Sequence, residues 1–260
     1  MRAPEKTLVG CLAADVLHLI LVPSAGSRPG SARRYEAPSA RRMQPRVVRG
    51  VKNLLTDRAG ELRALSLSWS GGEPLEAGDL VVGLLSHAAH LRRKHPRLLF
   101  QSDLSTGGDL LDRHTFERLV SLGVGEFRVT FDGEDLREAG PHARGGWAAR
   151  LDRVWTNLAE LRTVRRPFTL CVRLPGSEDE LGRHVERYHK VVRGDSRFDL
   201  ALCTRPELLA EQPDASSFVV RPDGCVDRCS PLRPSPDAVL GHLHESGELE
   251  LDGLDDAPRF

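Results

Sequence analysis

The feature that most constrains the fold is a regular alternation of short apolar runs with longer amphipathic stretches, from residue 16 to residue 202. The short runs are rich in Val, Leu, Ile and Phe, and the longer stretches place apolar residues at helical spacing. The predicted strands cover 16–22, 65–69, 97–101, 126–131, 167–174 and 198–202, and the predicted helices cover 44–55, 80–94, 112–122, 147–162 and 178–192. Because parallel strands need crossover helices, this order predicts an α/β protein with a parallel sheet, either open or curled into a partial barrel.

The alternation stops near residue 203. Pro and Asp become frequent after this point, and the segments 217–220 and 224–226 have the pattern of a β-hairpin. We therefore predict two units, a larger one over 1–203 and a smaller one over 204–260.

Composition excludes several classes of protein. The chain has 260 residues with 37 basic and 37 acidic side chains, and this balance argues against a protein that binds nucleic acid or a membrane surface. No apolar run approaches the roughly 20 residues that a membrane span needs. The five cysteines are irregularly spaced, which is not the pattern of a disulfide framework, so we expect a reducing cytoplasmic location.

Ligands of parallel α/β proteins bind at the carboxyl ends of the strands, so the residues after each strand are the candidates for function. These are the loops 24–34, 70–74, 105–108, 130–133 and 173–175.

These loops carry a family resemblance. Residues 69–75 read Trp-Ser-Gly-Gly-Glu-Pro-Leu, which resembles the Gly-Gly-Glu-Pro motif after the second strand of radical SAM enzymes. The resemblance continues in the same order through 105–111, 129–133 and 151–158. The peptide- and sulfatase-modifying members have a C-terminal twitch or SPASM region, and this region is similar to 217–224, Cys229 and 239–243 of the chain.

The resemblance implies a partial (β/α)6 TIM-like barrel of radical SAM type, followed by a small twitch-like α+β subdomain. It also implies that S-adenosylmethionine (SAM) is bound by Gly71, Gly72, Glu73, Thr130 and Arg173. In the family, the residue that corresponds to Glu73 meets the amino group of SAM.

The chain departs from the family in the loop after the first strand. The family holds a [4Fe–4S] cluster there with Cys-x3-Cys-x2-Cys, and the three ligand positions correspond to Ser27, Ser31 and Arg34 of this chain. Such clusters need thiolate ligands, serine is a poor substitute, and an Arg cation cannot ligate iron. No cysteine occurs between residues 12 and 170. We therefore expect no [4Fe–4S] cluster, no usual radical chemistry and at most weak binding of SAM.

The resulting hypothesis is a catalytically inactive relative that acts by binding. It would present a peptide substrate, or support an active radical SAM partner enzyme, during peptide modification. Two alternatives stay open: an enzyme that uses SAM by polar chemistry, and a radical enzyme whose cluster is completed by a partner chain. The sequence assigns no catalytic residue.

A zinc site is a further alternative, because Cys225 and Cys229 precede His242 and His244. Two thiolates and two imidazoles would form a tetrahedral set. The spacings are unlike those of zinc fingers, so we favour a hairpin with solvated histidines and assign no metal.

Overall fold

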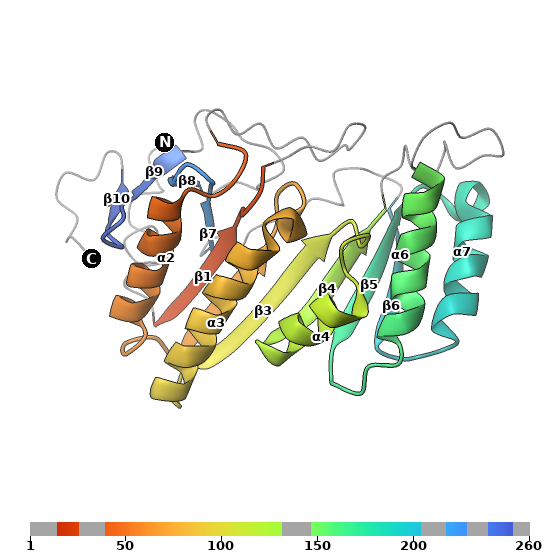
Figure 1. The fold of residues 1–260 in the computed structure, drawn as a ribbon, viewed down its shortest axis with the longest axis horizontal. Coiled ribbons are helices and arrows are strands. Elements are labelled where there is room, and N and C mark those ends of the chain that lie inside the picture. Colours follow the sequence, from red (N-terminus) through yellow and green to blue (C-terminus); the bar gives the residue numbers. More distant parts are fainter. Residues whose placement is uncertain (1–14, 26–39, 132–146, 204–216, 228–238, 252–260) are drawn as a thin grey trace, which may run out of the picture.

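The computed structural model describes residues 15–25, 40–131, 147–203, 217–227 and 239–251. These residues form one ten-stranded sheet, and the described helices pack on one of its faces (Figure 1). The strands are β1 (Val16–Leu21), β2 (Ala64–Trp69), β3 (Leu99–Thr106), β4 (Val124–Thr130), β5 (Thr169–Pro175), β6 (Phe198–Cys203), β7 (Ser217–Val220), β8 (Cys225–Asp227), β9 (Val239–Leu243) and β10 (Leu249–Leu251). The helices are α2 (Pro45–Arg58), α3 (Gly78–Lys94), α4 (Arg113–Ser121), α6 (Trp147–Leu161) and α7 (Glu178–Val192), with a 3-10 turn at Pro74–Ala77.

The first six strands are all parallel and lie in sequence order from β1 to β6. Strand β6 is one edge of the sheet and β10 is the other, so the sheet is not closed. The predicted α/β class and parallel sheet are thereby confirmed.

Strand β3 differs from its prediction of 97–101, because it runs from Leu99 to Thr106. Its second half alternates polar side chains on one face with buried residues such as Leu104 on the other. Polar residues on both sides of Leu104 removed the apolar signal on which the prediction depended.

The core lies between the sheet and the helices. Alternate residues of the central strands, such as Leu19, Leu67 and Val172, are completely buried there with the apolar sides of the helices. Trp69 lies in the same layer, and its Nε1 donates a hydrogen bond to Ser102 Oγ at 3.0 Å. Burial of this apolar layer is the main force that holds the helices on the sheet.

The opposite side of the sheet carries polar residues at most of the intervening positions, and we call this side the polar face. Beside them, Ile20, Val22, Ala25 and Val219 form a small buried apolar cluster on the same side. The polar members of this face are His18, Ser66, Ser68, Gln101, Asp103, Ser105, Arg128, Thr130, Cys171 and Arg173. Several of these polar side chains are buried, among them Ser68, Ser105 and Thr130.

The strands after residue 216 extend the same sheet beyond β1. Strand β7 pairs in parallel with β1, and β8, β9 and β10 follow as antiparallel strands. The predicted hairpin is confirmed, because Val219 and Val220 of β7 pair with Asp227 and Val226 of β8. The division of the chain near residue 203 stays a prediction.

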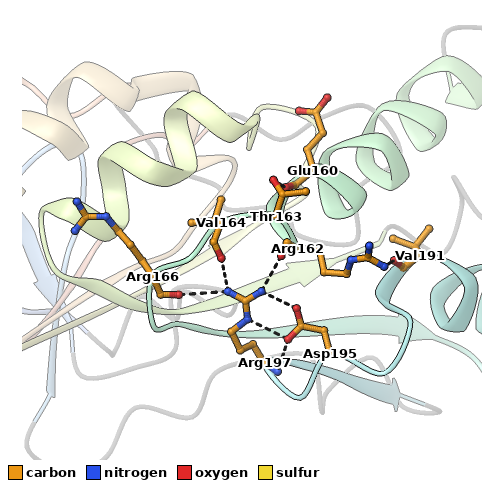
Figure 2. A network of polar contacts seen from close by, with 8 residues as sticks. All are labelled: Glu160, Arg162, Thr163, Val164, Arg166, Val191, Asp195 and Arg197. Atoms are coloured by element: carbon orange, nitrogen blue, oxygen red, sulfur yellow. Dashed lines mark hydrogen bonds and ion pairs between the residues drawn. The ribbon is translucent and has the colours of Figure 1, made fainter.

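At the opposite end of the sheet from the strand carboxyl ends, one arginine holds three segments together (Figure 2). The Arg197 guanidinium donates to the carbonyl oxygens of Arg162, at 2.8 Å, and of Val164. It also pairs with Asp195 at 2.6 Å and lies over the Phe168 ring at 4.5 Å. The end of α6 is thus fixed to the beginnings of β5 and β6.

Candidate functional site

The loops after β1, β2 and β3 meet at the carboxyl edge, which is the end of the sheet where strands β1 to β6 finish. Gly72 N donates to Ser24 O at 3.0 Å. Gly71 has a φ of +106°, and a Cβ built on it would lie 2.5 Å from Val22 Cγ1. Glycine is required at this position because any side chain would be strained and would collide with the end of β1.

Glu73 connects the β2 loop to the β3 loop. Its Oε1 accepts hydrogen bonds from Leu75 N at 3.1 Å and Thr106 Oγ1 at 2.8 Å, and its Oε2 accepts one from Gly107 N at 2.8 Å. The side chain is buried, with 2% of the residue exposed. The carboxylate therefore has a structural function that does not depend on any ligand.

Asn157 of α6 supports the same edge, and sequence reasoning did not assign it this role. Its Nδ2 donates to Gly108 O at 2.8 Å, and the residue is 7% exposed. Gly108 has a φ of +85°, and a Cβ there would lie 2.7 Å from Val129 Cγ1. A polar residue on the otherwise apolar side of a predicted helix is the signal that could have identified Asn157.

Thr130 and Arg173 lie next to each other at the ends of β4 and β5. They are register partners, and Phe131 N donates to Arg173 O at 3.0 Å. Thr130 Oγ1 is buried and has no hydrogen-bond partner among the residues that the structure describes. A buried hydroxyl without a partner costs free energy, so this atom fits a site that a polar ligand group completes.

Cys171 lies two residues before Arg173 on the polar face. Burial raises the pKa of its thiol, and the nearby Arg173 guanidinium opposes this increase. The net direction disfavours a thiolate, so Cys171 is not activated as a nucleophile.

The predicted cluster positions Ser27, Ser31 and Arg34 lie outside the described residues. The two ends of that loop are described and lie together, because Ala25 N donates to Arg41 O at 2.8 Å and Met43 N to Pro23 O at 2.9 Å. The donor set does not fit an iron–sulfur cluster, because it offers two hydroxyls and a guanidinium in place of three thiolates.

Only part of the predicted zinc set can be placed. Cys225 Sγ lies 3.7 Å from His242 Nδ1, and His244 Nε2 lies 2.6 Å from Glu250 Oε2, while Cys229 is outside the described residues. Burial raises the pKa of the Cys225 thiol to about 11. Within the described ranges, no three His, Cys, Asp or Glu side chains are grouped so that they could hold a metal ion.

Comparisons with solved structures decide the fold. The structure of anSMEcpe with bound AdoMet superposes with a TM-score of 0.58 at 16% identity, covering 87% of this chain and 78% of that one. BtrN in complex with AdoMet and 2-DOIA gives 0.50 at 15% identity, covering 87% and 78%. SuiB of Streptococcus suis bound to S-adenosylmethionine gives 0.52 at 14% identity, covering 82% and 60%. This chain has the radical SAM fold. The fold that the loop motifs indicated is therefore confirmed.

One curated protein adds a sequence similarity to this fold. A PqqA peptide cyclase of Gluconobacter oxydans (strain 621H) is 34% identical over 114 residues. The match spans 44% of this chain and 29% of the cyclase. No family model matches the chain.

The described helices were also compared with the requirements of a membrane span. None of them is long and apolar enough to cross a bilayer.

Proposed function

We propose that this chain is a cluster-less relative of the radical SAM enzymes that acts by binding at the polar face and the carboxyl edge, during the modification of a peptide. The peptide part of this proposal is supported by the name of the PqqA peptide cyclase and by an anSMEcpe structure with bound AdoMet and the Cp18Cys peptide. Its partner would be a peptide or an active radical SAM enzyme.

The proposal is carried by one combination: the chain has the radical SAM fold, but the residues at the cluster positions are unsuitable as ligands of iron. Gly72, through its hydrogen bond to Ser24 O, and Glu73, through its bonds to Thr106 and Gly107, hold the loops of β1, β2 and β3 together. This explains how the motif could serve the fold without a cluster. Ser27, Ser31 and Arg34 cannot ligate iron as thiolates do.

Weak SAM binding is the second candidate, and the buried Thr130 hydroxyl favours it. We propose that Thr130 and Arg173 would contact a polar part of SAM, and that Gly71, Gly72 and Glu73 would shape its neighbourhood. SAM would supply an electrophilic carbon for polar transfer. Since Glu73 already accepts three hydrogen bonds, its share in holding an amino group would be small.

Two measurements on the full chain test the proposal. Incubation with SAM and a strong reductant under anaerobic conditions is expected to give no reductive cleavage of SAM, and repeated turnovers would contradict the proposal. Calorimetry then compares SAM binding by the unmodified chain with binding by Thr130→Val, which removes the hydroxyl and keeps the shape. A heat of SAM binding that is lost in Thr130→Val supports SAM binding as the second candidate function. No heat of binding with either protein excludes that candidate.

The smaller unit remains part of the proposal. We propose that 204–260 is a small twitch-like subdomain and that the chain works in the cytoplasm. The β7–β8 hairpin supports the first statement, and the irregular cysteines support the second.

A further inference from the structure

A continuous row of hydrogen bonds crosses four strands on the polar face. His18 Nε2 lies 2.8 Å from Ser68 Oγ, Ser68 Oγ donates to Asp103 Oδ1 at 2.6 Å, and Arg128 Nη1 donates to Asp103 Oδ2 at 2.5 Å. Each member comes from a different strand, in the order β1, β2, β3 and β4. The row is separate from the loops at the carboxyl edge.

The number of protons in the row fixes the tautomer of His18. An ionised carboxylate only accepts hydrogen bonds, so the single hydroxyl proton of Ser68 is used on Asp103. Ser68 Oγ can then only accept from His18, and Nε2 must carry the proton. The other ring nitrogen, Nδ1, keeps its lone pair and has no hydrogen-bond partner among the residues that the structure describes.

The surroundings indicate which kind of group would meet Nδ1. Ser68 is 4% exposed, whereas His18 and Arg128 at the two ends of the row are half-buried. Arg128 is occupied by its ion pair with Asp103, so the imidazole is the end with an acceptor to offer. Because Nδ1 offers a lone pair, a hydrogen-bond donor of a ligand suits this end of the row.

We propose that His18 Nδ1 accepts a hydrogen bond from a hydroxyl group of a ligand that lies on the polar face. Ser68 and Asp103 are positioning residues that hold the imidazole in the Nε2–H tautomer, as a carboxylate does for a histidine base. The inference rests on the proposed function only in taking the polar face as the binding surface. The ligand class that we propose is a peptide side chain that carries a hydroxyl group.

The tautomer is tested first, without any ligand, by ¹⁵N NMR of the imidazole nitrogens, with His18→Gln used to assign the signal. The unmodified chain is expected to show a protonated Nε2 and an unprotonated Nδ1. In Asp103→Asn the amide oxygen would face Arg128 and the amide nitrogen would donate to Ser68, so Ser68 would donate to His18 and the proton would move to Nδ1. A protonated Nδ1 in the unmodified chain, or the same tautomer in both proteins, would overturn the inference.

Binding is tested with N-acetylserinamide as the hydroxyl probe and N-acetylalaninamide as its matched control. Only the hydroxyl probe should shift the His18 resonances saturably, and the shift should fall at least fivefold in Asp103→Asn. Ser68→Ala, which removes the bridge at a small buried residue, should cause the same loss if Asp103→Asn does not fold. Equal shifts from both probes, or none from either, would reject the hydroxyl site. An iron–sulfur cluster found in this chain would contradict the proposed function and leave the tautomer result unchanged.

Discussion

At the residue scale, Gly71 and Glu73 show that a motif typical of cofactor binding also has a structural function. The sequence predicted both residues as cofactor contacts, because the Gly-Gly-Glu-Pro pattern identified them. It could not show that the Glu73 carboxylate is turned toward Thr106 and Gly107, since those contacts depend on how β3 is placed beside β2.

Glu73→Gln should destabilise the fold by about 2 kcal/mol, because an amide places a donor where the carboxylate accepts from buried donors. Urea denaturation measures the change. Glu117→Gln is the matched control, since Glu117 forms an exposed i,i+4 pair with Arg113 and should cost less than about 0.5 kcal/mol. Equal stability of the two variants would mean that the Glu73 contacts do not stabilise the edge.

Gly71→Ala should cost about 2 kcal/mol or more, because of the positive φ and the 2.5 Å approach to Val22 Cγ1. Gly83→Ala is the opposite case. Gly83 lies within α3 and a Cβ there meets no atom within 4 Å, so alanine should stabilise the protein by up to about 1 kcal/mol. Thermal unfolding of the two variants should shift in opposite directions, and a shift in the same direction would contradict the structure.

The buried carboxyl group of Asp227 makes the stability of the fold depend on pH. Burial raises the pKa of its carboxyl from 3.8 to about 6, against the opposing effect of Arg221, and Asp223 also raises it. A raised carboxyl pKa stabilises the folded state at low pH, and this contribution is lost as pH rises from about 4 to about 6. Titration of the Asp227 carboxyl carbon by ¹³C NMR should give a midpoint near 6, and a midpoint near the ordinary 3.8 would refute the assignment.

At the element scale, the parallel strands and their helices followed from hydrophobic periodicity alone. Helix α7 was predicted at 178–192 and lies at Glu178–Val192, with a capping box at its start and the αL residue Arg193 after its end. The second half of β3 was missed, because its polar face and its buried Ser102 and Thr106 give no apolar alternation. The pairing of β7 with β1 joins segments that lie far apart in sequence, so no local pattern could indicate it.

Arg197→Lys tests how the ends of α6, β5 and β6 are held. Lysine keeps the charge but lacks the planar fork that reaches the Arg162 and Val164 carbonyl oxygens and Asp195 together, so we expect a loss of about 2 kcal/mol. Arg113→Lys, at an exposed ion pair, is the control with an expected loss below about 0.5 kcal/mol. Urea denaturation compares them, and a loss in Arg197→Lys no larger than in the control would show that the network is dispensable.

At the scale of the whole molecule, the open sheet has a helical side and an opposite side that is rich in polar residues. The helical layer and the loop contacts of Gly71, Glu73 and Asn157 build the scaffold. The polar face, with the buried Thr130 hydroxyl and the row that starts at His18, is where we propose that a ligand binds by polar contacts. We propose that this scaffold works without an iron–sulfur cluster.

Iron and sulfide analysis of the anaerobically reconstituted full chain, together with its visible spectrum, tests this claim most directly. The variant Ser27→Cys, Ser31→Cys and Arg34→Cys, which restores the three thiolates of the family motif, is the control for successful reconstitution. We predict well below one iron per unmodified chain and no broad band near 400 nm, whereas about four irons with that band, as expected for a [4Fe–4S] centre, would contradict the account.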